Sequence, residues 1–160
     1  MSKNKYSLPL NKKDIEGIKF SAPAHIGKLK HSIDFRCKVG REIFSAFAGE
    51  VVRVKNDSNI GGPDKKFWHD GNWVAIKHLN GEYSLYEHLK FKGVVVKVGG
   101  KVDRGQLIGY SGNTGYSSVP HLHFHVFVFN GLNPEEDFES LPIDWDRAGN
   151  VFLASNKKEE

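Results

Sequence analysis

Short runs of alternating or uniformly apolar residues, separated by glycine-rich turns, recur along almost the whole chain. Alternation with a period of two over about four to eight residues is typical of β-strands. No amphipathic pattern extends beyond about two helical turns, so the chain is predicted to be all-β. The runs that predict strands are Glu50–Val54, Trp73–Lys77, Tyr83–His88, Val94–Val98, Leu107–Tyr110 and His121–Phe129.

Turn signals between these runs indicate that the strands reverse direction often. Asn80-Gly81 is a two-residue hairpin signal, and Gly99-Gly100 and Gly112–Gly115 adopt positive φ at low cost. Frequent reversals favour a compact antiparallel sheet of the barrel or sandwich type, with few or no helices. The polar segment 56–71 carries Phe67 and Trp68, and we expect a surface loop there that walls a cleft.

Length and composition predict one domain. The chain has 160 residues, of which 39% are hydrophobic, enough to bury a core. After Pro134 the sequence turns acidic and less periodic. We predict a single domain over residues 1–153, with a core at about 7–129 and an acidic C-terminal extension at 134–153. Residues 154–160 are predicted to be a disordered tail.

The charge is unevenly distributed. Residues 134–160 carry 3 basic and 8 acidic side chains, whereas residues 1–133 carry 20 and 11. The basic body suits an anionic polymer, but the chain has no arginine-rich helix or RNA-binding aromatic motif, so no nucleic-acid partner is expected. No run approaches the roughly 20 apolar residues of a membrane span, and residues 1–10 do not form a signal peptide. One cysteine, Cys37, excludes an internal disulfide and a cysteine-based zinc cluster.

Histidines are the main chemical signal. His121, His123 and His125 stand at i, i+2 and i+4, so they project from one face of a strand. A metal site needs further ligands, and Asp34, with His25 and His31 upstream, offers them. Two histidines and an aspartate suit zinc, and the fourth tetrahedral position remains for a water whose pKa zinc lowers to about 7.

His88 lies in the run Tyr83–Leu89. Alternation places Tyr86 and His88 on one face of the strand, and Leu85 and Leu89 on the other. This position alone fits a buried, hydrogen-bonded histidine as well as a functional one.

Together, these motifs closely resemble the M23 family of zinc metallopeptidases, of the lysostaphin or LytM type. The resemblance covers roughly residues 7–129 and rests on Tyr83–Leu89, Gly105–Gly109, Gly112–Gly115 and Pro120–Phe124, in that order. It implies a β-sheet groove, one zinc ion, and hydrolysis of peptide bonds in bacterial cell-wall peptidoglycan. It also implies action in the cell envelope or outside the cell.

The resemblance also suggests a role for each site residue. His123 and Asp34 match zinc ligands, while His121 and His88 match the two catalytic histidines. The usual third ligand precedes the aspartate by four residues, but that position is Lys30. His25, which precedes the flexible Gly27, is the preferred substitute, and His31 is the alternative.

The sequence therefore predicts a monomeric zinc metalloendopeptidase that cleaves stem peptides or cross-bridges of peptidoglycan. The alternative is a catalytically inactive module of the same fold that binds peptidoglycan or regulates another wall hydrolase, and Lys30 is its main support. His125 is expected to face solvent or, alternatively, to partner a zinc ligand. His69 and His78 are expected to be exposed or structural.

Overall fold

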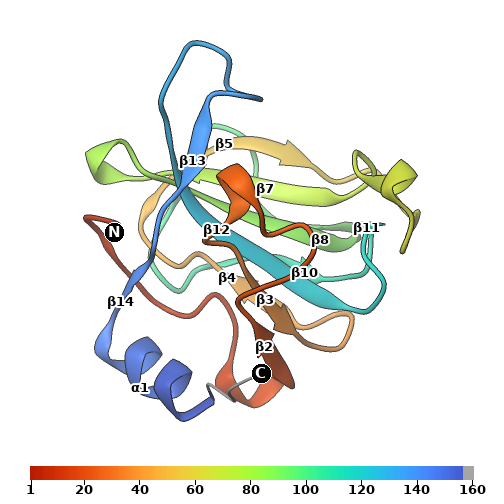
Figure 1. The fold of residues 1–160 in the computed structure, drawn as a ribbon, viewed down its shortest axis with the longest axis horizontal. Helices are drawn as coiled ribbons and strands as arrows, with labels where there is room; N and C mark the ends of the chain where they lie inside the picture. The colour runs from red at the N-terminus through yellow and green to blue at the C-terminus, as the bar shows by residue number, and fades with distance from the viewer. Residues whose placement is uncertain (157–160) are drawn as a thin grey trace.

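The computed structural model describes residues 1–156 and confirms the predicted all-β class. Ten strands form one sheet with antiparallel neighbours, whose main path runs β2-β3-β12-β8-β7-β5-β9 (Figure 1). Strands β4 and β10 pair with each other beside β8, and β13 pairs with β12. Two short parallel pairs, β1 with β14 and β6 with β11, lie outside this sheet. Strands β2 and β9 end the main path without pairing to each other, so the sheet is open over the described residues.

The strands are β1 (Lys5–Tyr6), β2 (Gly17–Lys19), β3 (Ile33–Arg36), β4 (Glu42–Phe44), β5 (Gly49–Lys55), β6 (Gly61–Gly62), β7 (Asn72–Lys77), β8 (Tyr83–Val94), β9 (Lys101–Val102), β10 (Leu107–Ser111), β11 (Gly115–Tyr116), β12 (His121–Phe129), β13 (Phe138–Ser140) and β14 (Asp144–Trp145). The helices are four single 3-10 turns, η1 (Lys12–Asp14), η2 (Gly27–Leu29), η3 (Lys65–Phe67) and η4 (Leu79–Gly81), and the α-helix α1 (Arg147–Asn156).

Strand β12 forms the centre of the sheet, between β3 and β8. Its even-numbered residues Leu122, Phe124 and Val126 are buried in the core, so its odd-numbered histidines face the other way. The hairpin from β7 to β8 turns at Asn80 and Gly81, which have φ values of 63° and 71°. The predicted hairpin signal is therefore confirmed, because a two-residue hairpin of this type needs positive φ at both positions.

Two segments differ from the predicted elements. Of the run Val94–Val98, only Val94 belongs to a strand, the end of β8. Val95 and Val98 are exposed, so the run is not one buried strand. Helix α1 extends through residues 154–156 of the predicted disordered tail, and residues 157–160 lie outside the described part of the chain.

Helix α1 is stabilised by hydrogen bonds at both of its ends and by burial of Leu153. Its N-terminal cap is Asp146, whose Oδ1 accepts a hydrogen bond from the Gly149 N–H at 2.8 Å. Leu153 is buried against the core. Asn156 donates a side-chain hydrogen bond to the Phe152 carbonyl in the last turn. Because tertiary packing supplies most of this stabilisation, the apolar pattern alone did not predict the helix.

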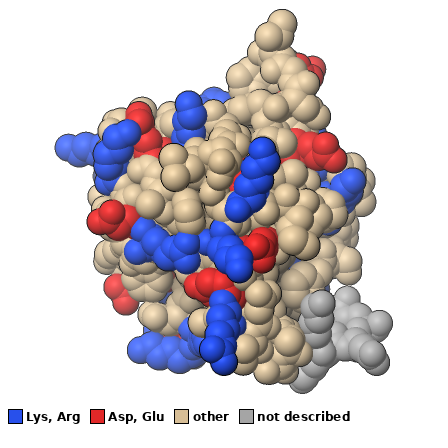
Figure 2. All heavy atoms as spheres, turned by 90° about the vertical axis from the view of Figure 1, so that its left-hand side faces the viewer, with Lys and Arg blue, Asp and Glu red and all other residues tan. Residues whose placement is uncertain are grey.

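The surface carries charge of both signs. On the face shown in Figure 2, basic side chains lie beside acidic ones and form no uninterrupted patch. Lys101 pairs with Glu50 at 2.6 Å, and Arg104 lies 3.8 Å from Asp146. Among residues 1–156, no helix has the length and apolar character that crossing a bilayer requires.

His78 is a structural histidine, as predicted. It is 5% exposed, and its Nδ1 lies 2.9 Å from the Ala48 carbonyl while its Nε2 lies 2.7 Å from Ser84 Oγ. Nδ1–H donates to the Ala48 carbonyl, which can only accept, whereas Ser84 Oγ can either accept from Nε2 or donate to it. Burial lowers the pKa of His78, against smaller opposing effects of the Ala48 carbonyl and Glu82.

We therefore expect His78 to make the stability of the metal-free protein pH-dependent. The pKa of His78 is lower in the folded chain, so unfolding takes up a proton and this stabilisation is lost as the pH falls below about 6.5. In His78→Gln, whose amide can make both contacts, this loss is absent. Urea unfolding at pH 7.5, 6.5 and 5.5 should show the stability advantage of the wild type over His78→Gln falling by up to about 1.4 kcal/mol per pH unit. A constant difference would contradict the assignment.

Candidate active site

His25, Asp34 and His123 converge on one point of the groove face. Each offers one ligand atom, and the three atoms lie within 4.8 Å of one another. His123 on β12 pairs directly with Asp34 on β3, so the sheet register itself brings them together. His25 comes from the loop before β3, which turns at Gly27 with a φ of 55°. Two nitrogens and a carboxylate oxygen are a donor set that fits zinc and leaves a fourth position open.

Hydrogen bonds hold this cluster together. Asp34 Oδ1 lies 3.1 Å from His25 Nε2 and 3.0 Å from His123 Nδ1. Burial alone would raise the pKa of Asp34, but the hydrogen bonds from His123 and His25 hold it well below its usual range. For His123, burial favours the neutral ring, yet the hydrogen bond to Asp34 and the negative charge of Asp34 raise its pKa overall. Asp34 is therefore a carboxylate at neutral pH.

The second nitrogen of each clustered histidine has its own partner. His25 Nδ1 lies 3.4 Å from the Phe20 carbonyl, and His123 Nε2 lies 3.1 Å from His125 Nδ1. In this arrangement His25 Nε2 and His123 Nδ1 donate to the Asp34 carboxylate. A metal ion would displace those two protons, and the outer contacts would then hold a proton on His25 Nδ1 and His123 Nε2. His125 is 2% exposed and stacks on Phe138, so the expectation that it faces solvent is wrong and the alternative, a partner of His123, describes its position.

His31 and Lys30 lie away from the cluster. The His31 backbone N–H donates to Ser140 Oγ, and its side chain lines a separate cavity with Phe20 and Trp145. Lys30 Nζ lies 3.7 Å from Glu139 at the surface. Of the two candidate histidines, the structure thus places His25, and not His31, against Asp34.

His88 and His121 lie beside the cluster, and in both rings Nδ1 contacts a backbone carbonyl. His88 Nδ1 lies 2.7 Å from the Thr114 carbonyl, and His121 Nδ1 lies 2.8 Å from the Val119 carbonyl. Each Nδ1–H therefore donates to backbone, which leaves both Nε2 atoms as acceptors. The two ring centroids are 4.5 Å apart. Burial lowers the pKa of His121, and burial together with His121 and His123 lowers that of His88 to about 3, so both rings are neutral at neutral pH.

A β-bulge turns His88 into the groove. Trp73 pairs with Glu87 and Asn72 with Leu89, so His88 is an extra residue on β8, and its φ is 66°. The predicted alternation is therefore wrong here: Tyr86 and Leu89 are both buried in the core, whereas Glu87 and His88 both line the groove.

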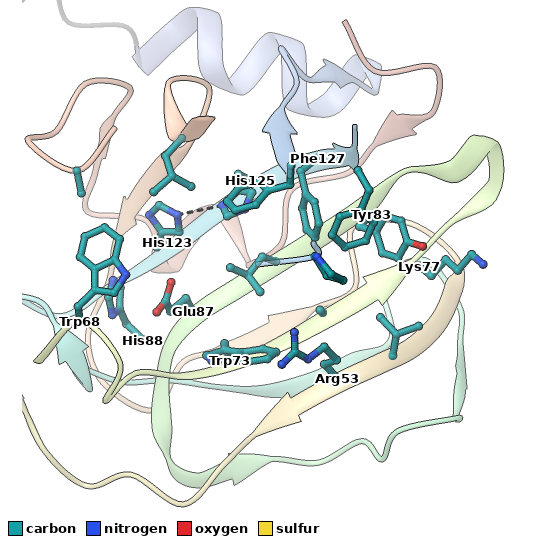
Figure 3. A pocket seen from close by; sticks show the side chains of 18 of the residues that line it. Arg53, Trp68, Trp73, Lys77, Tyr83, Glu87, His88, His123, His125 and Phe127 are labelled. Carbon is teal, nitrogen blue, oxygen red and sulfur yellow. Dashed lines mark hydrogen bonds between the residues drawn. The ribbon is translucent and has the colours of Figure 1, made fainter. Parts of the chain in front are cut away.

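Glu87 is a groove residue that the sequence analysis missed, because strict alternation placed it on the face opposite His88. Figure 3 shows it near His88, His123, Trp68 and Trp73. Burial raises the pKa of its carboxyl group. Only knowledge of the bulge at His88 would have indicated this position, and the sequence carries no signal for that bulge.

The groove has a volume of about 650 Å³ and two different ends. Near the cluster it is lined by Trp68, from the loop predicted to wall a cleft, and by Tyr116, whose ring lies 5.9 Å from that of Trp68. Arg53 lies next to Trp73, and Lys77, Tyr83 and Phe127 lie farther from the cluster (Figure 3). Phe129 and Phe138 also line the groove. Such an elongated, aromatic cleft suits an extended peptide.

Comparisons with known proteins agree with this geometry. The peptidoglycan DD-endopeptidase ShyA of Vibrio cholerae serotype O1 is 38% identical over 95 residues, which are 59% of this chain and 19% of ShyA. A zinc-containing peptidase from Vibrio cholerae aligns over 77% of this chain and 36% of its own, with a TM-score of 0.56 and 28% identity. The catalytic domain of the antimicrobial peptidase lysostaphin from Staphylococcus simulans aligns over 79% of this chain and 84% of its own, with a TM-score of 0.54 and 26% identity.

The chain spans about a fifth of the length of the curated relatives it matches. The sequence model of peptidase family M23 matches residues 28–134 of this chain. The matched range begins within η2 and ends beyond β12. That range includes Asp34, His88, His121 and His123. With a zinc-containing peptidase among its structural neighbours, zinc is the metal that the His/Asp cluster implies. By sequence and by fold, the chain belongs to peptidase family M23.

Proposed function

We propose that this chain is a monomeric metalloendopeptidase that binds one zinc ion through His25, Asp34 and His123 and hydrolyses peptide bonds of bacterial peptidoglycan in the cell envelope. The observation that carries the proposal is the cluster of three ligand atoms beside two histidines whose Nε2 atoms make no hydrogen bond within residues 1–156; His121 Nε2 lies 3.7 Å from Asp34 Oδ1. When bound, zinc supplies a Lewis acid that polarises the scissile carbonyl and activates water.

The histidines of the chain handle the protons. Peptide hydrolysis adds the oxygen of water to the carbonyl carbon, breaks the C–N bond and requires a proton on the leaving nitrogen. Neutral His88 and His121 accept a proton at Nε2 and, once protonated, donate it to the leaving amine or to the carbonyl oxygen. Because Thr114 and Val119 hold the Nδ1–H groups, neither ring has to change tautomer before it acts.

An inactive binding module is the less favoured function. Its main support was Lys30 in the usual ligand position, but His25 lies against Asp34 and supplies a nitrogen donor in place of that residue. A chain that only bound peptide would also have no use for two neutral imidazoles whose Nε2 atoms face the cluster as proton acceptors.

Metal removal tests the proposed reaction. We expect the zinc-loaded protein to release soluble fragments from purified peptidoglycan, with one new amino group and one new carboxyl group per cut. A chelator such as 1,10-phenanthroline should abolish this release and added zinc should restore it. Labelling of new amino groups detects cleavage of peptide bonds, and a reducing-sugar assay detects cleavage of glycosidic bonds. New reducing ends without new amino groups, or cleavage that survives complete zinc removal, would contradict the proposal.

A further inference from the structure

The carboxylate of Glu87 accepts no hydrogen bond from any described residue, although it lies within electrostatic range of His123 and His69. It lines the groove with His88 and His123, and neither a hydrogen bond nor an ion pair joins it to any residue between 1 and 156. Its Oε1 approaches Gly71 so closely that a Cβ at that position would lie 2.8 Å away. Among the described residues, Ser32 Oγ is the only buried side-chain oxygen or nitrogen without a hydrogen bond, so the Glu87 oxygens are still reached from the groove. A ligand in the groove can therefore supply the hydrogen-bond donor that the chain does not.

The surroundings of Glu87 indicate the chemistry of that donor. Trp68 and Trp73 lie beside Glu87 in the groove (Figure 3), and Tyr116, whose ring centroid is 5.9 Å from that of Trp68, also lines it. Aromatic faces attract cations, and a carboxylate among them supplies a full negative charge. A primary ammonium group has three N–H donors on a compact cation, which matches a carboxylate and aromatic walls together.

The position of Glu87 determines where on the substrate this ammonium lies. Glu87 is directly opposite His123 in the register of β8 and β12, and it precedes His88. A group held by Glu87 is therefore close to the bond that reacts.

Arg53 lies on the far side of Trp73 from Glu87, with its guanidinium 5.3 Å from the centre of the Trp73 ring (Figure 3). Lys77 lies farther along the groove. These two positive charges repel a cation and attract a carboxylate. Charge along the groove thus gives a bound peptide one preferred direction.

We propose that Glu87 is a specificity-determining residue that binds a free primary ammonium group of the substrate peptide next to the scissile bond. The inference rests on the proposed peptidase function and adds the substrate class to it. The ammonium has two sources in a peptide, the side chain of a diamino acid such as lysine and a free N-terminus, and they share the chemistry that Glu87 recognises.

The test compares synthetic wall peptides that differ only in acetylation. One pair carries lysine with its side-chain amine free or acetylated, and a second pair carries the N-terminal amine free or acetylated. Binding to the metal-free protein is measured through the fluorescence of Trp68 and Trp73, and cleavage is measured separately with the zinc-loaded protein. Glu87→Gln removes the charge at constant size, and Glu50→Gln, which removes an exposed carboxylate paired with Lys101, is the matched control.

We expect wild type and Glu50→Gln to bind the free-amine member of one pair about tenfold more tightly than its acetylated partner. The pair that shows this preference identifies the source of the ammonium. Glu87→Gln should bind both members equally. Equal binding of all four peptides by the wild type, no binding of any of them, or an unchanged preference in Glu87→Gln would overturn the inference.

The two readouts separate this inference from the proposed function. An amine preference in binding with no cleavage of any peptide would leave the role of Glu87 in place and contradict the peptidase function. Cleavage without an amine preference in binding would support the peptidase function and contradict the role of Glu87. A Glu87→Gln variant that binds every peptide like the wild type but cleaves all of them equally slowly would identify Glu87 as a proton-transfer group and overturn the specificity role.

Discussion

Replacement of His123 by alanine is expected to abolish both zinc retention and peptide cleavage. His123 contacts Asp34 through Nδ1 and His125 through Nε2, so its ring connects the ligand cluster to the buried side of the groove. Losing a residue that only orients a ligand costs about 10-fold to 100-fold in affinity or activity. Loss of the ligand itself should exceed the upper end of that range, with zinc falling from about one ion per chain to background.

His69→Ala is the matched control, because His69 is an exposed histidine of the loop before β7. It should keep both zinc and activity. Elemental analysis after gel filtration and cleavage of a fluorescent wall peptide provide the two readouts, and circular dichroism verifies that each variant is folded. Stoichiometric zinc in His123→Ala would show that the ion binds elsewhere.

The second large effect should separate His25 from His31. His25→Ala removes the imidazole that lies 3.1 Å from Asp34, and we expect zinc retention and cleavage to fall more than about 100-fold, as for His123→Ala. His31→Ala removes a ring that lines a different cavity, and its zinc content and activity should match the wild type.

The pair is well matched because both variants delete one imidazole from the same loop region. A titration with a zinc-competing chelator gives the affinity of each variant without depending on activity. Loss of zinc in His31→Ala with retention in His25→Ala would reverse the ligand assignment. Equal retention in both would leave Asp34 and His123 as the only ligands from this cluster.

Residue spacing predicted much of the site but could not choose the third ligand. The alternation in β12 placed His121, His123 and His125 on one face, and the sheet bears this out. His25 and His31 both precede Asp34 by a short distance along the chain. Which of them returns to Asp34 depends on the positive φ of Gly27 and the turn η2, a path that hydrophobic periodicity does not encode.

The position of Glu87 in the groove could not be predicted for a related reason. A one-residue bulge reverses the facing of every side chain that follows it, and no pattern in Tyr83–Leu89 signals that His88 adopts a φ of 66°. Helix α1 was missed because burial of Leu153 is a tertiary effect, and because the cap Asp146 is a local signal that the hydrophobic pattern does not include. The all-β class and the hairpin at Asn80-Gly81, by contrast, follow from local sequence patterns, and both predictions are confirmed.

The first and last strands of the described chain also determine how the molecule bears tension. β1 and β14 run parallel, with Lys5 opposite Asp144 and Tyr6 opposite Trp145. The Glu82 carboxylate accepts hydrogen bonds from the backbone of Lys3 and Asn4 and from the Tyr6 hydroxyl, which adds an anchor beside this pair. A force that pulls residues 1 and 156 apart loads β1 and β14 in shear, so their hydrogen bonds resist together. Strands β3, β8 and β12 are shielded from that force until this clamp yields, and the geometry of the groove is preserved under stretching.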